Sequence, residues 1–400
     1  MPQLETRYHM SIAIVGAGLS GLVCARILQL NNIPVAIYEM DPSEEARQQG
    51  GSLDIHTGTG QEALRQAGLH EEFRRNTHAG GEAIRVLDKN AHVYVDHEKP
   101  AGGHGRPEID RKVLRHLLIE SLEPGTIVWG SKVTAVRSEG AGIRLEFADG
   151  TAAQADLIVG ADGAWSKVRA LLTDVRPAYT GVTVVEIRLS DAVTRHPRAL
   201  EVTGSGSFFA LSDNKYIGGH GGDQIALGCG MRVPEDWVTA SEIDWADSPG
   251  ARAALLLQFP DWDTSLTDLI RECDDTIWPR PIHALPVGHA WAHVPGVTLV
   301  GDAAHVMSPF AGEGANLALI DGADLARAIV GHVDVNAAIM AYEKKMFRRG
   351  NKAAAASAKG LNMMFTSGPP RKLAAFFNGM ALLRSAARPF DNLLHRNRRT

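Results

Sequence analysis

The sequence predicts an α/β fold that carries an inserted antiparallel β-sheet and ends in a long helix. Three observations support this class. A buried strand at 12–15 leads through a glycine-rich turn into a helix and then a strand at 35–39, which is the β-α-β order of a parallel sheet. Between about 176 and 273, short strands alternate with turns of Gly, Ser and Asp. A helical pattern then runs from 333 to about 360.

The length of the chain, 400 residues, exceeds one ordinary domain and predicts two packed domains. We assign 1–175 and 275–335 to a discontinuous first domain, 176–274 to an inserted β-sheet domain, and 336–400 to a C-terminal helical segment that bridges them. The hydrophobic content of 44% is that of an ordinary soluble protein, and no apolar run of about 18 residues is present to span a membrane.

Charge and cysteine usage exclude several functions. The net charge of -5 argues against nucleic acid as a main partner, because phosphate binding needs a basic field. Cys24, Cys229 and Cys273 lie far apart and follow no metal-ligand spacing, so we expect reduced core thiols and no metal site. The first ten residues carry charge and no long apolar segment, which predicts a cytoplasmic protein.

The glycines after the first strand have the spacing of a dinucleotide-binding turn. Gly16 permits the tight turn, Gly18 lets a pyrophosphate approach the backbone, and Gly21 lets helix and strand pack closely. Glu39 ends the second strand, where a carboxylate accepts hydrogen bonds from ribose hydroxyls. This pattern predicts a Rossmann-like domain; the alternative is a plain tight turn.

A second glycine-rich stretch runs from Leu299 to Asn316. A short buried strand turns at Gly301-Asp302, continues through a Pro-Phe loop, and leads into a helix predicted at 314–327. The free N–H groups at that helix start favour negative charge or an electron-rich ring in front of them. The alternative is a capped turn before a surface helix.

A third turn lies between these two along the chain. A buried strand ends in Gly160-Ala161-Asp162-Gly163, and Ser166 has the residue type of a helix N-cap. Asp162 either supports a ligand or accepts backbone hydrogen bonds as an ordinary turn residue.

These three motifs, in this order across about 300 residues, resemble the fingerprints of the class A FAD-dependent aromatic hydroxylases and monooxygenases. The resemblance implies the hydroxylase fold, with Asp302 on the ribityl chain of FAD and the following helix aimed at the pyrimidine end of the flavin. The residues that it assigns to FAD are Gly16, Gly18, Gly21, Glu39, Asp162, Asp302, Pro309, Gly314, Ala315 and Asn316.

One branch of this family, the tetracycline-inactivating monooxygenases, is the most similar in the segments around Gly50-Gly51 and 107–111. That resemblance implies that Asp54 and Arg111 contact FAD and that Arg47 contacts NADPH, whereas a solvated loop charge is the other interpretation of each. The branch has Arg after the ribose acid, and this chain has Met40, which removes a cation from the adenine side.

The resemblance also places the substrate. It implies that the inserted sheet forms the floor of the pocket and that Met307, Pro309 and Phe310 cover it and exclude water. The polar Gln, Arg and His of the tetracycline branch correspond to about Glu186, Gly206 and Ala226, and none is kept. This argues against tetracycline as the native substrate, and Glu186 remains the sheet residue that we assign to substrate.

We therefore expect a monomeric, FAD-dependent, NAD(P)H-consuming monooxygenase. It would insert one oxygen atom of O₂ into an electron-rich aromatic, enolic or polyketide-like molecule through a flavin C4a-hydroperoxide. The cofactor carries the chemistry, so no side chain is assigned a catalytic role, and His305 is expected to orient its loop. The alternatives are a flavin reductase or dehydrogenase of the same fold, and a flavoprotein that binds a ligand without turnover.

Overall fold

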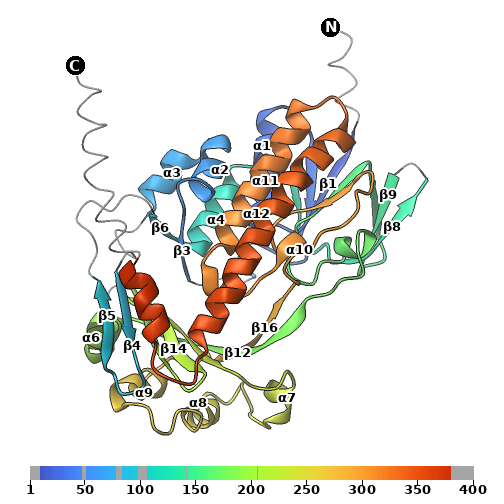
Figure 1. Cartoon of the computed structure of the whole chain (residues 1–400). Helices are drawn as coiled ribbons and strands as arrows, with labels where there is room; N and C mark the ends of the chain where they lie inside the picture. Colours follow the sequence, from blue (N-terminus) through green and yellow to red (C-terminus); the bar gives the residue numbers. More distant parts are fainter. Residues whose placement is uncertain are drawn as a thin grey trace, which may run out of the picture. The chain divides into compact units, whose positions relative to one another are not determined.

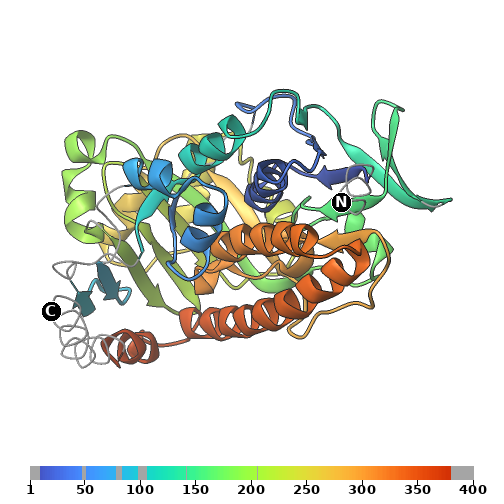
Figure 2. The ribbon, with the colours of Figure 1, turned by 90° about the horizontal axis from the view of Figure 1, so that it is seen from above.

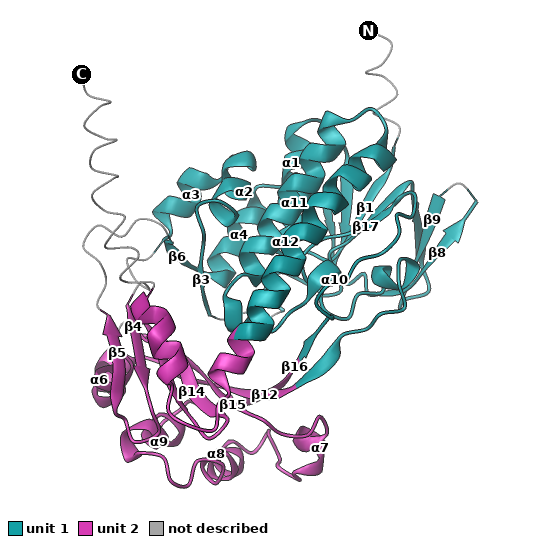
Figure 3. Cartoon of the chain, in the orientation of Figure 1, with its two compact units in different colours: residues 1–79, 104–180, 283–359 teal, residues 80–103, 181–282, 360–400 magenta. Residues whose placement is uncertain are grey.

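The computed structural model describes residues 10–46, 51–77, 83–97, 106–140, 142–204 and 206–379 (Figure 1). The chain divides into two compact units, each assembled from three segments (Figure 3). Unit 1 comprises Met1–Ala79, His104–Thr180 and His283–Lys359. Unit 2 comprises Gly80–Gly103, Gly181–Ile282 and Gly360–Thr400.

A five-stranded parallel sheet forms the centre of unit 1, in the order β17-β11-β1-β2-β7. All four residues of β1 are buried, because strands flank it on both sides and its side chains enter the core of the unit. The bounds are β1 Ile12–Val15, β2 Val35–Tyr38, β7 Ile127–Val128, β11 Leu157–Gly160 and β17 Val297–Leu299.

Three long helices pack together in unit 1: α1 (Leu19–Leu30), α11 (Gly314–Gly331) and α12 (Val335–Met364). In both ribbon views α11 lies beside α1 and α12 runs along α11 (Figures 1 and 2). The approach of α11 to α1 is close: a Cβ added at Gly322 would lie 2.2 Å from the carbonyl oxygen of Ser20. Only glycine fits at this crossing.

The remaining elements of unit 1 are short. From its residue type before a helical run, Asp110 is predicted to cap a helix. The structure confirms this, because Asp110 is the N-cap of α4 and its side chain accepts a hydrogen bond from the backbone N–H of Lys112 at 2.7 Å. The bounds are β3 Ser52–Asp54, α2 Gly60–Gln66, α3 His70–Arg75, β6 Glu108–Asp110, α4 Arg111–Glu120, β8 Val133–Glu139, β9 Gly142–Phe147, β10 Ala152–Ala155, the 3₁₀ helices η2 Val168–Leu171 and η3 Pro309–Ala311, and α10 Asp302–His305.

Unit 2 is built on a seven-stranded sheet in the order β16-β12-β15-β14-β13-β4-β5. Neighbours from β12 to β13 are antiparallel, as predicted, but β4 joins β13 in parallel. The predicted hairpin of β4 and β5 thus extends the inserted sheet. The bounds are β4 Ile84–Leu87, β5 Val93–His97, β12 Ala178–Leu189, β13 Ser207–Ser212, β14 Lys215–His220, β15 Ile225–Met231 and β16 Trp278–Ala284.

Helices share a hydrophobic core with this sheet. The strand pattern of the sequence predicts no helix between about 176 and Pro249, and this prediction is wrong. Two of the helices, α5 and α6, are too short for a helical period to show in the sequence, although Pro197 marks the first turn of α6. The bounds are α5 Ala192–Arg195, α6 Pro197–Thr203, α7 Trp237–Ala240, α8 Ser248–Leu256 and α9 Thr264–Arg271.

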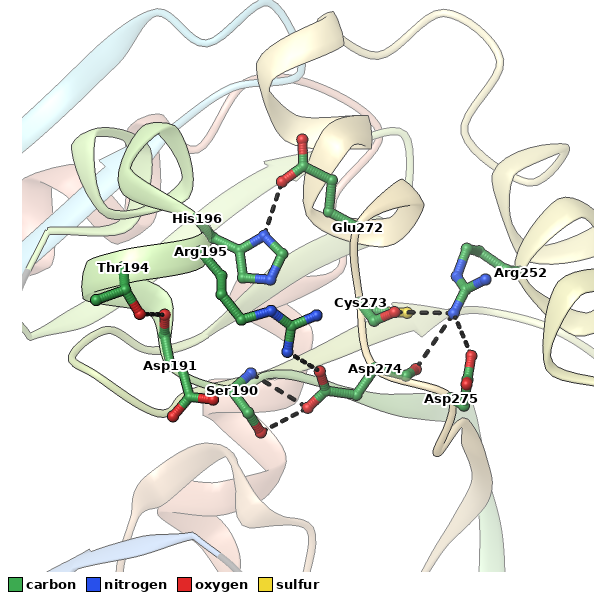
Figure 4. Close-up of polar contacts among 10 residues, drawn as sticks. All are labelled: Ser190, Asp191, Thr194, Arg195, His196, Arg252, Glu272, Cys273, Asp274 and Asp275. Carbon is green, nitrogen blue, oxygen red and sulfur yellow. Dashed lines mark hydrogen bonds and ion pairs between the residues drawn. The ribbon is translucent and has the colours of Figure 1, made fainter.

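A polar network links these helices to the strand edge (Figure 4). His196 Nδ1 lies 2.8 Å from Glu272 at the end of α9, and the Ser190 hydroxyl donates to Asp274 at 2.6 Å. Arg252 pairs with Asp275 at 3.0 Å. The segment after α9 is therefore held by side chains from both α5–α6 and α8.

The C-terminal part of the chain follows the predicted pattern with shifted boundaries. The sequence predicts a helix break at Gly368-Pro369-Pro370 and a last helical segment from Arg371 to about Ala387. In the structure α12 ends at Met364, and the chain is helical again over 371–379. The predicted end of that segment near Ala387 lies outside the described residues. Among the described residues, no helix combines the length and apolarity needed to cross a membrane.

We expect Gly322→Ala to destabilise the protein by about 1–3 kcal/mol, because the new methyl group would overlap the Ser20 carbonyl. Gly331→Ala, on the same helix, is the control, since a Cβ there meets no atom within 4 Å; it should be neutral or stabilising by up to about 1 kcal/mol. Urea unfolding of both variants measures the difference. Equal effects would contradict the proposed helix contact.

Candidate active site

The three glycine-rich turns meet at one edge of the unit 1 sheet. Their strands β17, β11 and β1 are neighbours and parallel, so their carboxyl ends lie side by side, with Val15 paired to Gly160 and Gly160 to Leu299. The carboxyl edge of a parallel sheet is where ligands bind in open α/β folds. Gly16 has φ +104°, and a Cβ there would lie 2.5 Å from the carbonyl oxygen of Ala161. The first and second turns are therefore in contact.

The third turn is joined to the other two. Gly301 has φ +61°, and a Cβ there would lie 3.0 Å from Ser20 Oγ at the start of α1. Arg169, which is 4% exposed, donates to the carbonyl oxygens of Ala303 at 2.9 Å and Ala164 at 2.5 Å. One buried guanidinium thus ties the second motif to the third. The sequence analysis gave Arg169 no role.

Gly18 differs from the glycines on either side of it. A Cβ at Gly21 would lie 2.4 Å from Gly16 O, so Gly21 is required for packing, whereas at Gly18 the nearest atom would be 3.8 Å away. Gly18 is the N-cap of α1, which has neither a side-chain cap nor an acidic residue in its first turn. Its position is open on the protein side and suits the close approach of an anionic ligand.

Glu39 lies beside this turn, at the carboxyl end of β2, and is 4% exposed. Its two oxygens accept hydrogen bonds from the backbone N–H groups of Ala17 at 2.6 Å and Asp41 at 3.0 Å. Each carboxylate oxygen can accept more than one hydrogen bond, so the side chain retains capacity for ligand hydroxyls.

Asp162 caps the turn that follows β11. Its Oδ2 accepts from the backbone N–H groups of Lys167 at 2.7 Å and Val168 at 3.4 Å. Its Oδ1 is buried without a hydrogen-bond partner in the protein, and burial raises the pKa of this carboxyl. Ser166 Oγ accepts from Arg169 N at 3.0 Å, but the element that follows is the 3₁₀ helix η2 with Lys167 at its N-cap position, so Ser166 is not the N-cap that its residue type predicts. The unpaired oxygen is a group that a bound ligand would satisfy.

Asp302 begins α10 directly after the Gly301 turn and is exposed. The surrounding protein nevertheless desolvates it and raises the pKa of its carboxyl, while His305 and Arg111 act in the opposite direction. The electrostatic influence of Arg111 shows that this predicted residue lies in the neighbourhood of Asp302. A carboxylate that is desolvated and still accessible is suited to accept hydrogen bonds from a ligand.

Asp54 lies in an ion cluster that sequence reasoning did not find. Its Oδ2 is 2.9 Å from His56 Nε2 and 3.6 Å from Arg106, and His56 Nδ1 is 3.6 Å from Glu313. Burial lowers the pKa of His56, but hydrogen bonds with Asp54 and Glu313 outweigh it and raise the pKa to about 9. His56 is therefore a cation at neutral pH, next to the start of α11. The sequence signal that could have indicated this cluster is the histidine two residues after Asp54.

Asn316 links the start of α11 to this cluster. Its side chain accepts from His56 N at 2.8 Å and donates to Asp54 O at 2.9 Å, and the residue is 1% exposed. The amide side chain is thus used within the protein. The helix start, with Gly314 and Ala315 in its first turn, has no side-chain cap, so its first backbone N–H groups are not bonded by a capping side chain.

The loop before α11 is held by α12. Ser308 is buried, and its Oγ lies 2.6 Å from Ser357 Oγ. Met307 and Phe310 are half-buried and Pro309 is exposed. The loop therefore presents apolar side chains from an anchored backbone.

The other predicted site residues belong to unit 2 or lie outside the described residues. Arg47 belongs to the undescribed stretch 47–50. Glu186, on the sheet of unit 2, forms a bidentate pair with Arg280, at 3.1 Å and 3.2 Å. A Cβ at Gly206 would lie 2.3 Å from Ala83 O, so this glycine serves strand packing. Among the described residues, no group of three His, Cys, Asp or Glu is placed to hold a metal ion.

Comparisons with known proteins agree with this geometry. Residues 9–205 and 291–357 match a family model described as an FAD binding domain. The chain is 32% identical to the monooxygenase asqM of Emericella nidulans over 373 residues, which cover 79% of this chain and 82% of that protein.

Two solved structures share the fold. HpxO of Klebsiella pneumoniae, complexed with FAD and uric acid, has a TM-score of 0.75 at 20% identity, covering 90% of both chains. The tetracycline destructase Tet(55) has a TM-score of 0.72 at 17% identity, covering 96% of both chains. The three motif turns at one sheet edge, the family match and the identity to a monooxygenase lead to one conclusion: the chain belongs to the family of FAD-dependent monooxygenases.

Proposed function

We propose that this protein uses NAD(P)H and O₂ to insert one oxygen atom into an electron-rich aromatic or enolic small molecule. The observation that carries the proposal is the meeting of three turns at one sheet edge, with Gly18 open, Asp162 Oδ1 unpaired and Asp302 accessible. These features fit a long, two-ended nucleotide that contacts all three turns. When bound, FAD supplies the redox chemistry, accepting hydride from reduced nicotinamide and activating O₂.

The residues of the chain have three tasks in this proposal. Gly18 and the start of α1 bind the pyrophosphate, and Glu39 accepts from ribose. Asp302 accepts from the ribityl hydroxyls, while the N–H groups at the start of α11 stabilise negative charge on the reduced ring. Met307 and Phe310 exclude water from the reacting position. Arg111 and the Asp54 cluster contribute to the electrostatics near Asp302 and the start of α11.

One of the similar solved structures supports an electron-rich substrate. The similar HpxO structure contains uric acid, a nitrogen-rich heteroaromatic compound. The similarity to a tetracycline destructase, at 17% identity, extends to the fold alone. We therefore propose a planar ring bearing a hydroxyl or enol group as substrate, with tetracycline as a compound to test.

We assign substrate contact to Glu186 and Arg280, within unit 2. Glu186 lies on β12 opposite Gly228 of β15, on the sheet face that carries small residues. At Gly228 a Cβ would lie 2.6 Å from Val184 and 2.9 Å from the Tyr216 hydroxyl. Gly228 therefore leaves room for Val184 and the Tyr216 ring to lie close to the sheet. An apolar and aromatic surface beside a bidentate charge pair suits a planar ring with a polar edge.

The test of this function is substrate-stimulated turnover. The purified protein should be yellow, and NAD(P)H oxidation should rise when a true substrate from a panel of phenols, quinolones, tetracyclines and polyketides is added. With ¹⁸O₂, one labelled atom should appear in the product. Hydrogen peroxide without labelled product would instead identify a reductase, and tight ligand binding without NAD(P)H consumption would identify a binding module.

Gly18→Ala should weaken FAD binding without destabilising the protein. The backbone at Gly18, with φ -79° and ψ 172°, accepts alanine, and the nearest protein atom is 3.8 Å from the new Cβ. We expect the unfolding free energy of the apoprotein to change by less than about 0.5 kcal/mol, and the Kd for FAD to rise about tenfold or more because the methyl group blocks the pyrophosphate. Fluorescence titration gives the Kd. An unchanged Kd would exclude this turn as the binding site of the pyrophosphate.

Glu186→Gln should raise the KM for substrate about fivefold and leave the Kd for FAD unchanged, since it removes about 1 kcal/mol of hydrogen bonding outside the flavin-binding turns. Asp268→Asn is the matched control, because Asp268 pairs with Arg271 at 2.5 Å on α9 and is similarly exposed. Steady-state kinetics on both variants decide the assignment. Equal KM values in both variants and the parent would exclude Glu186 from the substrate site.

A further inference from the structure

Asp321 on α11 is a buried carboxylate that the proposed function does not use. It is 0% exposed, yet it has three hydrogen-bond partners, two in the Gly301–His305 turn and one on α12. Its Oδ2 accepts from Gly301 N at 3.2 Å and lies 2.5 Å from His305 Nε2, and its Oδ1 accepts from Arg349 Nη2 at 2.7 Å. Burying an isolated carboxylate is strongly unfavourable, and the three donors compensate for the loss of its hydration.

The contacts of Asp321 fall at the two ends of one short turn. Gly301 precedes α10 and His305 ends it, and Asp302 lies between them. The backbone N–H of His305 also donates to Gly301 O at 3.0 Å. A single carboxylate oxygen therefore sets the separation between the start and the end of the turn that carries Asp302. Asp302 contributes its carbonyl oxygen to the turn, which accepts from Val306 N at 3.2 Å, and the residue stays accessible.

The other side of this network is α12. Arg349 donates to Asp321 and also to Asp324, each at 2.7 Å. The neighbouring Gly350 lies against the His305 ring, where a Cβ would be 3.1–3.3 Å from three atoms of that side chain. Glycine is disfavoured in the interior of a helix, and this contact explains its presence there. The α12 helix thus holds His305 from one side and Asp321 from the other.

Charge supports the same arrangement. Burial lowers the pKa of His305, but Asp321 raises it and the net shift is upward; the same pairing lowers the pKa of Asp321. Each member of the pair thus favours the charged form of the other, and His305 also lowers the pKa of Asp302.

We propose that Asp321 is a positioning residue for FAD, which holds the Gly301–His305 turn in its binding conformation and couples that turn to α12 through Arg349 and Gly350. The proposal rests on the assignment of FAD to Asp302 made above. It predicts that the affinity for FAD depends on residues that do not touch the cofactor.

The first test compares Asp321→Asn with Asp324→Asn. Both changes are nearly isosteric, and both remove a carboxylate that pairs with Arg349 at 2.7 Å, but only Asp321 contacts Gly301 and His305. We measure the Kd for FAD by titrating apoprotein, the melting temperature of the apoprotein, and the reduction potential at saturating FAD. Asp321→Asn should raise the Kd about tenfold or more, the loss of about one charged hydrogen bond, and should shift the potential. Asp324→Asn should change the Kd less than about twofold.

A merely structural role would lower the melting temperature of both variants and leave the Kd and the potential unchanged, and this outcome would overturn the proposal. If the parent protein itself does not bind FAD, the proposed function fails instead, which the same titration shows.

A second variant keeps the test decisive where Asp321→Asn does not fold. Gly350→Ala favours the helix but forces the His305 ring to shift, since the new Cβ would lie 3.1 Å from its nearest atom. We expect a folded apoprotein with a Kd for FAD raised about three- to tenfold. Gly331→Ala, with no atom within 4 Å of its Cβ, should leave the Kd unchanged. A Gly350→Ala protein with the parent affinity contradicts the coupling.

Discussion

The contact between Gly16 and Ala161 is the constraint on which the rest of unit 1 depends. With strands on both sides of β1, the turn after it can lie against the turn after β11 only if residue 16 has no side chain and a positive φ. The approach of Gly301 to Ser20 then adds the third turn at the same edge. Motifs that are distant in sequence become one surface because three strands are parallel neighbours.

Buried polar side chains fix the positions of the turns that form this surface. Arg169 joins the second and third turns, Asn316 joins the start of α11 to the segment around Asp54, and Asp321 joins the Gly301 turn to α12. Each is nearly inaccessible to solvent. In a low-dielectric interior such bonds are directional and costly to leave unmade, so they define one geometry for the loops in front of them. The accessible groups, such as Asp302, stay available to a ligand.

Much of this architecture could be predicted where consecutive residues encode it. The order β1-α1-β2 and the Asp110 cap follow from local spacing, and the alternation of short strands predicted the sheet of unit 2. The parallel pairing of β4 with β13 could not be predicted, because it joins Ile84 to Ser207 and no local pattern specifies so distant a partner. The four- and seven-residue helices α5 and α6 carry too few residues for a period to register.

The site shows the same division. The motifs predict ligand contacts at Asp302 and the helix start, but the use of the Asn316 side chain inside the protein depends on His56, 260 positions away. The distance in sequence between His56 and Asn316 also determines when this contact can form during translation. A growing chain leaves the ribosome with its amino terminus first, so the segment around Asp54 cannot bond to Asn316 until α11 has been synthesised. During translation the Gly16 turn is therefore made well before the α11 segment that would complete the proposed FAD site.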